Sequence, residues 1–593
     1  MADSDGMVVD KKKIACRLCR AIIAYSGNTS SMTKTNSVNG GKLSEEDTVV
    51  DDEVEAQPES KQLTLSAAYK RTAPFLQNSP RYCSLLRATT NFIFHMMQPL
   101  SLVDEPAFRN LLQVAEPRFQ LPHCTHITTK VLPEAYSGVR MAVEKQLALA
   151  SKCTITTDLW TSQHQQRSYM SLTVHFIADD FTLQSKCLQT LEVPQDHDAA
   201  SLKDVLSSMF SDWKITDKVC GGISDNGSNI VNSFTLLNID HYPCIAHTLQ
   251  LAVNKGLKVA RVQRIIARCK AIVSHFKRST KETYKLREKQ ELLKLPQHML
   301  VQDCVTRWGS TLSMLQRLIE QQTAISAVLV EGKDRHLMLE IGDWEVVEML
   351  VELLKPFQQA TTVMGAVRYP TLSTVMPLLY KLLTKTLKIT QGDSATSKAV
   401  KQEIKKDLDD RYHKPAVERI INMATFLDPR YKELPFLDSY SKREIVDMVE
   451  EELISLESDS TNQELRTEEV VDDDLDPPVS KKKKGPISKL IGDLFEGQNS
   501  SGSSTCKASK ELELYRAEQP VKDLDSDPLT WWKSRQSVYP LLCQLVKAVH
   551  CFVATSVPSE RLFSSSGNII SSSRSRLTPE HADQLIFLFE NKA

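Results

Sequence analysis

Long hydrophobic runs are missing from this chain of 593 residues. No uninterrupted apolar stretch approaches the roughly 20 residues that a membrane-spanning helix needs. The first residues are polar and lack the apolar core of a secretory signal, so we expect no export. Charge of one sign is also lacking, because 73 basic residues offset 74 acidic residues and the formal net charge is −1. Any surface that binds nucleic acid must therefore be a local patch.

Cysteine is present, but without the regular spacing of a disulfide framework. The 13 cysteines are scattered and odd in number, which favours a reducing, intracellular compartment. Hydrophobic residues make up 41% of the chain, which is ample for large buried cores. The length suggests about four domains.

The N-terminal segment contains a C-x2-C pair, Cys16 and Cys19. Zinc needs four ligands, and a finger usually supplies its second pair about 12–20 residues later. That interval holds neither cysteine nor histidine, and the next histidine is His95. Two interpretations stay open: ordinary cysteines in a flexible tail, or a Zn²⁺ finger at 1–26 that lacks its second ligand pair. Residues 27–61 are rich in small and acidic residues, which predicts a disordered linker.

Helical periodicity begins in the next segment, 62–149, where apolar residues recur at the spacing of a helix face. Strand patterns follow, at 151–157, 169–176 and 182–193, with connections short enough to predict an antiparallel meander. The middle run alternates between its two faces along its whole length. We therefore expect an α/β core over 150–258.

A helix at 201–213 and a fourth strand at 218–224 complete this pattern. The first strand leads into Asp158 and the fourth ends at Asp225. Strand-strand-strand-helix-strand with acids at these two ends is the topology of a ribonuclease H-like domain. We expect the first and fourth strands to be neighbours, which would bring the two carboxylates together.

The rest of the chain is predominantly helical. Residues 259–454 read as amphipathic helices, and within them Arg307 and Trp308 form either a structural corner or a platform on which a base stacks, worth roughly 1–3 kcal/mol per base. An acidic stretch and a lysine run mark 455–509 as a linker, with nuclear import as a second role for the lysines. The last block, 510–593, is so apolar that it must be buried against the core or against another protomer.

Five short motifs together carry a resemblance to a known family: D-L-W-T-S at 158–162, S-D-N-G-S-N at 224–229, C-I-A-H at 244–247, R-W-G-S at 307–310 and P-S-E-R-L-F-S at 558–564. The chain from about residue 60 to 593 resembles a hAT-superfamily transposase of the group with N-terminal BED-type zinc fingers. The C-R-L-C segment resembles the front of such a finger, truncated here.

The resemblance implies a role for each matching residue. Asp158, Asp225 and Glu560 would form the catalytic triad, and three carboxylates can hold two Mg²⁺ ions about 4 Å apart. Arg307 and Trp308 match a contact to a DNA hairpin. The helical stretch resembles an insertion domain that interrupts the ribonuclease H-like core, and the last block resembles the family's dimerisation region. Apart from the resemblance, the basic residues Arg574 and Arg576 of that block are either contacts to DNA phosphates or solvated surface charges.

Two functions follow from this resemblance. The first is a nuclear, DNA-binding and dimerising protein derived from a transposase that regulates transcription or chromatin. The second is a working Mg²⁺-dependent DNA transposase that cuts and joins strands. Some relatives are associated with SUMO ligation, which we favour less. A plain dimerisation partner is the third alternative.

Overall fold

The computed structural model describes residues 73–162, 166–193, 196–304, 308–332, 334–365, 371–412, 415–468, 506–569 and 577–592, together with three short N-terminal strands. Those strands, β1 (Gly6–Asp10), β2 (Lys13–Cys16) and β3 (Ile22–Ala24), pair antiparallel within a first unit, 1–72. The side chain of Cys16 and all of Cys19 lie outside the described residues, as does the predicted linker at 27–61. The truncated finger therefore stays a prediction.

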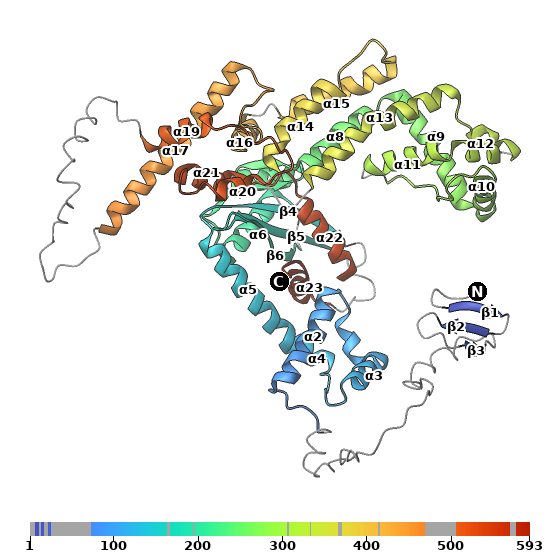
Figure 1. Cartoon of the computed structure of the whole chain (residues 1–593), viewed down its shortest axis with the longest axis horizontal. Helices are drawn as coiled ribbons and strands as arrows, with labels where there is room; N and C mark the ends of the chain where they lie inside the picture. The colour runs from blue at the N-terminus through green and yellow to red at the C-terminus, as the bar shows by residue number, and fades with distance from the viewer. Residues whose placement is uncertain are drawn as a thin grey trace, which may run out of the picture. The chain divides into compact units, whose positions relative to one another are not determined.

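A five-stranded mixed sheet forms the centre of the second unit, 73–593 (Figure 1). Its strands lie in the order β6-β5-β4-β7-β8. The pairs β6–β5 and β5–β4 are antiparallel, and the pairs β4–β7 and β7–β8 are parallel. The predicted meander and the predicted neighbourhood of its first strand with the strand before Asp225 are both confirmed. The strands are β4 (Cys153–Ser162), β5 (Arg167–Ile177), β6 (Leu183–Glu192), β7 (Val219–Ser224) and β8 (His241–Pro243).

Strand β4 extends beyond its predicted end. It continues to Ser162 because Trp160 and its neighbours pair in register with β5, where Trp160 lies opposite Tyr169. The two rings stack with centroids 5.9 Å apart. Strand β8 was not predicted, since three residues are too few to show a period.

One side of the sheet is covered by helices from both ends of the second unit. Residues of α2, α5, α6 and α23 share a hydrophobic core with β4, β5 and β6. The helix α2 begins where Ser79 accepts a hydrogen bond from the Tyr82 N–H and Pro80 occupies the first helical position. The bounds here are α2 (Pro80–His95), α3 (Pro106–Ala115), α4 (Cys124–His126), α5 (Leu132–Leu149), α6 (Ala199–Asp212) and α7 (Ser228–Leu236).

Helices alone fill the described part of the chain from 245 to 468, and they share a second hydrophobic core. Figure 1 shows them extending from the sheet. In α9 seven large apolar residues recur at helical spacing and are buried: Val262, Ile265, Ile266, Cys269, Ile272, Val273 and Phe276. The bounds are α8 (Ile245–Leu257), α9 (Ala260–Arg278), α10 (Thr280–Leu292), α11 (Trp308–Glu320), α12 (Gln322–Glu331), α13 (Ile341–Met364), α14 (Val375–Lys381), α15 (Ala395–Tyr412), α16 (Pro415–Phe426) and α17 (Ser439–Glu468). Within the described ranges, no helix is apolar enough over sufficient length to cross a bilayer.

The C-terminal helices return to the sheet and bury their apolar residues against it. The Thr190 N–H of β6 donates to Asp583 of α23 at 2.6 Å, and the Asn591 side-chain amide donates to the Cys187 carbonyl at 2.6 Å. We expected residues 510–593 to be buried against the core or against another protomer. Within the chain, they pack on the core. The helices are α19 (Lys507–Ala517), α20 (Pro528–Lys533), α21 (Pro540–His550), α22 (Val557–Ile569) and α23 (Pro579–Glu590).

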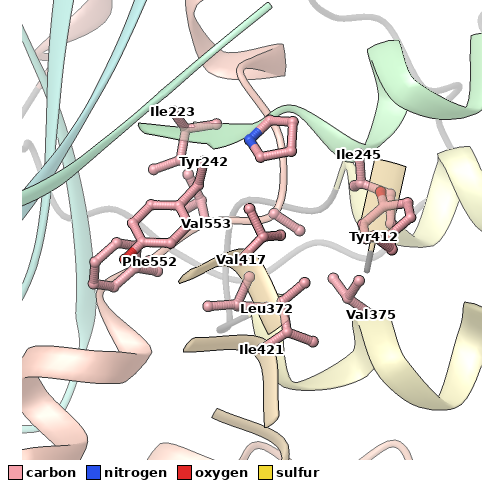
Figure 2. A pocket seen from close by; sticks show the side chains of 12 residues that line it. Ile223, Tyr242, Ile245, Leu372, Val375, Tyr412, Val417, Ile421, Phe552 and Val553 are labelled. Carbon is pink, nitrogen blue, oxygen red and sulfur yellow. The ribbon is translucent and has the colours of Figure 1, made fainter. Parts of the chain in front are cut away.

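The sheet, the helical stretch and the returning C-terminal segment meet around one small apolar cavity (Figure 2). Ile223 and Tyr242 line it from the sheet, Val417 and Ile421 from α16, and Phe552 from the segment after α21. Its volume is about 20 Å³, room for no more than one water molecule among apolar walls. Apolar side chains from all three parts therefore contact one another around this cavity.

Candidate carboxylate site

Asp158 and Asp225 line the same surface pocket. Strands β4 and β7 are parallel and in register, with Thr156 opposite Ile223, so each aspartate lies two residues beyond a paired position. The pocket has a volume of about 240 Å³. Its other walls come from the segment that starts α7 and from His197, two residues before α6. The lining residues are Thr157, Asp158, Leu159, His197, Asp225, Gly227, Ser228, Asn229 and Ile230.

Local hydrogen bonds hold both carboxylates. The Leu159 N–H donates to Asp158 Oδ1 at 2.9 Å, and the Gly227 N–H donates to Asp225 Oδ1 at 3.0 Å. The second bond closes a tight turn that carries the chain from β7 into α7. The Asn229 side-chain amide donates to the His197 carbonyl at 2.6 Å, which ties the opposite rim to this turn.

Burial and negative neighbours change the proton affinity of Asp158. Burial raises its pKa most, and the negative charges of Asp225 and Glu560 raise it further, to about 7, against the lowering effect of the Leu159 N–H. The charge of Glu560 is therefore felt at Asp158, although the two residues lie in distant parts of the sequence. Three acids predicted from separate motifs share one electrostatic environment.

Glu560 is brought to the sheet by its own helix, α22. Next to it, Ser559 Oγ donates to Thr156 Oγ1 of β4 at 3.0 Å across 403 positions of sequence. One turn further along, Phe563 stacks on Trp160 with ring centroids 5.7 Å apart. These contacts fix the first turn of α22 beside β4.

A buried polar chain supports this junction, and it was not predicted from the sequence. Thr156 Oγ1 is hydrogen-bonded to His175 Nε2 at 3.0 Å, and His175 Nδ1 is hydrogen-bonded to Ser185 Oγ at 2.8 Å. Burial lowers the pKa of His175 to about 3, so the ring is neutral at physiological pH. The alternation of β5 placed His175 on one face with polar residues, but both faces of the strand are buried. No local signal separates such a histidine from an exposed one.

The chemistry of these side chains fits a hard divalent cation. Carboxylate oxygens are the ligands that Mg²⁺ prefers, and a cation would offset the mutual repulsion that raises the pKa of Asp158. In the part of the chain that the structure describes, however, no three His, Cys, Asp or Glu side chains converge tightly enough to hold one ion together. The Mg²⁺ site of Asp158, Asp225 and Glu560 thus stays a prediction.

Trp308 lies away from this pocket and inside the helical core. It is the first residue of α11 and only 4% exposed, and its backbone N–H donates to Gln250 Oε1 at 3.1 Å. Its indole face is packed, so no base can stack on it in this arrangement. The position agrees with the structural-corner alternative. The other predicted DNA contacts, Arg307, Arg574 and Arg576, lie outside the described residues.

Comparison with known proteins gives three family-model matches that follow one another along the chain. Residues 156–243 match the ZBED1 RNase-like domain, and residues 242–353 match the ZBED1 RNase-like helical domain. Residues 511–591 match the hAT family C-terminal dimerisation region. The first match contains both aspartates and the third contains Glu560.

Individual relatives cover most of this chain. Zinc finger BED domain-containing protein 4 of Homo sapiens is 29% identical over 521 residues, which is 84% of this chain and 42% of that protein. The "Putative AC transposase" of Zea mays is 24% identical, covering 82% of this chain and 62% of that protein. The "Putative transcriptional regulator tpeD" of Talaromyces stipitatus is 23% identical, covering 84% of this chain and 60% of that protein. The chain thus spans about half the length of these relatives.

These matches define the class first: an RNase-like α/β core joined to helices and to a hAT dimerisation region. Together the matches support a hAT-derived protein of the zinc finger BED domain-containing (ZBED) type.

Proposed function

We propose that this protein is a nuclear, DNA-binding and dimerising regulator of transcription or chromatin that derives from a hAT transposase. The observation that carries the proposal is the match of residues 511–591 to the hAT dimerisation region. Relatives of similar coverage include a protein named as a transcriptional regulator and several zinc finger BED domain-containing proteins. A dimer that binds DNA presents two equivalent DNA-binding surfaces, which favours sites with two-fold repeats.

The fold is compatible with a role that needs no catalysis. The buried contacts between α22 and β4 hold the C-terminal block on the core through packing and hydrogen bonds alone. That arrangement would present the dimerisation region as a rigid surface whether or not the carboxylates react. A regulator of this kind depends on the integrity of the fold and is insensitive to the charge of Asp158.

The second candidate is an active DNA transposase, favoured by Asp158 and Asp225 sharing one pocket within the electrostatic reach of Glu560. These three residues would hold Mg²⁺ within a ribonuclease H-like core that a helical insertion domain interrupts. Bound Mg²⁺ would supply activation of an attacking oxygen and stabilisation of the leaving oxygen of a phosphodiester. The chain itself would orient the carboxylates through the N–H groups of Leu159 and Gly227.

One experiment tests the regulator. The full chain is used to select sites from a random duplex DNA pool, and the enriched site is placed before a reporter gene in cells. We expect an enriched site, a dimer in sedimentation velocity, and a reporter change that persists in Asp158→Asn and Glu560→Gln. A monomeric chain, or a pool without enrichment, would overturn the proposal.

A second experiment tests the transposase. Excision of a donor flanked by matched terminal repeats is compared between wild type, Asp158→Asn and Glu560→Gln. Glu580→Gln is the matched control, because Glu580 also lies in the first turn of a C-terminal helix but is exposed on α23. Catalysis by the triad predicts loss of excision in the first two variants and none in the control. Wild-type excision in all of them would exclude the triad.

A further inference from the structure

The hairpin formed by α9 and α10 carries a strong local positive charge. From 260 to 292 it carries ten basic residues and three acidic ones, whereas the whole chain has a net charge of −1. Four of these cations are paired: Arg268 with Asp343, Lys270 with Asp303, Lys285 with Glu282 and Lys289 with Glu331. The remaining cations create a local positive field of the kind that attracts phosphate groups.

A pocket lies at the turn of this hairpin, between the end of α9, one face of α10 and residues 297–300. Its volume is about 480 Å³, within the range of ordinary ligand clefts. The floor is apolar, because Phe276, Leu286 and Leu300 line it and are at most 5% exposed. The pocket is therefore suited to an apolar or aromatic group.

The rim of the pocket has a different chemistry. Tyr284 and Met299 line it with 63% and 61% of their surface exposed. Lys277 and Arg287 line it as well, and neither forms an ion pair with any residue in the described parts of the chain. An exposed aromatic ring beside two such cations is the arrangement that binds a base by stacking and its phosphate by charge.

The walls are held in place without a ligand. Thr283 Oγ1 donates to the Phe276 carbonyl at 2.6 Å, which closes the turn between the helices. The buried side-chain amide of Gln290 donates to the His298 carbonyl at 3.0 Å and to Gln321 Oε1 at 2.9 Å. Arg317 donates to the Met299 carbonyl at 2.6 Å. A ligand would meet a formed site and lose little affinity to ordering it.

We propose that this pocket binds an unpaired nucleotide, with the base stacked on Tyr284 and its phosphate between Lys277 and Arg287. The site is separate from the carboxylate pocket, because no residue lines both. It goes beyond the proposed function, since a regulator that binds duplex DNA needs no unpaired base. An acidic peptide would meet the same cations but would leave the aromatic rim and the apolar floor without a matching group.

The test is fluorescence anisotropy of a short labelled oligothymidylate with the full chain, in wild type and variants. Tyr284→Leu keeps an apolar side chain and removes the ring, and we expect binding at least about fivefold weaker. In the Lys277→Gln and Arg287→Gln double variant, we expect the slope of log K against log salt to fall by about 1.4. Tyr440→Leu and the Lys406→Gln, Arg443→Gln pair are matched controls at exposed positions on α15 and α17, and should bind as wild type.

Two further arms identify the source of the nucleotide. A nucleoside triphosphate without metal should displace the oligonucleotide if free nucleotides bind the site, and should leave it bound if the site needs a strand. Either result supports the proposal when Tyr284→Leu abolishes the binding that is observed in wild type. A blunt duplex of the same sequence should be insensitive to Tyr284→Leu. The proposal is overturned if that variant, shown by circular dichroism to be folded, binds the oligothymidylate as wild type does, or if only an acidic peptide binds. Neither result depends on whether the regulator selects a duplex site.

Discussion

The substitution Asp158→Asn should stabilise the protein, and by an amount that grows with pH. In the folded chain, burial and the charges of Asp225 and Glu560 raise the pKa of Asp158 from 3.8 to about 7. In the unfolded chain the same carboxyl group returns to its ordinary value. Asparagine has nearly the same shape, can still accept a hydrogen bond from the Leu159 N–H, and never carries the charge.

The sign follows from proton binding. Below about pH 4 the carboxyl group of Asp158 is neutral in both states and costs nothing. Between about pH 4 and pH 7 the unfolded chain loses this proton while the folded chain keeps it, so stability falls as pH rises. The shift of roughly three units corresponds to about 4 kcal/mol at pH 8 and about 1.5 kcal/mol at pH 5.

Urea unfolding of wild type and Asp158→Asn at about pH 5 and about pH 8 measures this difference. We expect the substitution to raise the free energy of unfolding by roughly 2–3 kcal/mol more at the higher pH than at the lower pH. Addition of Mg²⁺ at the higher pH should then stabilise the wild type, since an ion that binds only the folded state shifts the equilibrium by mass action. The variant should respond much less, because a charged ligand of the ion is gone.

Asp583→Asn is the control for the Mg²⁺ response. Burial also raises the pKa of Asp583 to about 7, but this residue accepts the Thr190 N–H and lines no part of the carboxylate pocket. It should keep the wild-type response to Mg²⁺. An equal gain for Asp158→Asn at both pH values would refute the electrostatic reasoning. An equal Mg²⁺ response in wild type and Asp158→Asn would refute the metal assignment and leave the pKa reasoning intact.

Three further sets of substitutions test buried contacts, two of them beside this site and one in the helical stretch. Thr156→Val should lower the free energy of unfolding by about 2–3 kcal/mol, because His175 Nε2 and Ser559 Oγ both lose their hydrogen bond to Thr156. Ser559→Ala removes only one of these bonds and should cost about 1 kcal/mol. Equal losses in urea unfolding would contradict this difference. Gly222→Ala should cost about 1–3 kcal/mol, since an added Cβ overlaps the ring of Phe234, and Phe234→Leu in the same chain should recover part of the loss; absence of recovery would place the clash elsewhere. Arg430→Met should cost about 3–5 kcal/mol, because it leaves the fully buried carboxylate of Asp428 without its cation. A thermal shift equivalent to less than about 1 kcal/mol would argue against a buried ion pair.

Much of the sheet could be predicted because its signals are local. Alternating apolar residues over 169–176 and β-branched residues before Asp158 are visible within windows of a few residues. The order of the strands followed from the short connections and from the position of the acids. The short strand β8 was not predicted, because three residues are too few to show an alternating pattern.

The functional value of individual residues was harder to predict. The motif around Trp308 reads the same whether the indole stacks on a base or packs in a core. Only the 4% exposure of Trp308 in the structure distinguishes these two roles. His175 lies in an alternating strand, yet it belongs to a buried polar chain that reaches α22 through Thr156. Both outcomes depend on which elements cover a residue, and that coverage comes from distant parts of the chain.

The sequence by itself indicated the class of fold, four strands of the core and the two aspartates on neighbouring strands. The periodicity of each strand is a local property, and the order of the elements along the chain matched the topology of a ribonuclease H-like domain. The tertiary structure decided that the last apolar block folds back on the same chain, and that α22, the helix of Glu560, contacts β4 across some 400 residues of sequence. It also decided the shape of the cationic pocket at the turn of the α9–α10 hairpin, although all of the lining residues fall within 276–300. The contacts between distant segments arise from the complementary shapes of buried surfaces, and no short window of sequence contains both of the surfaces that meet.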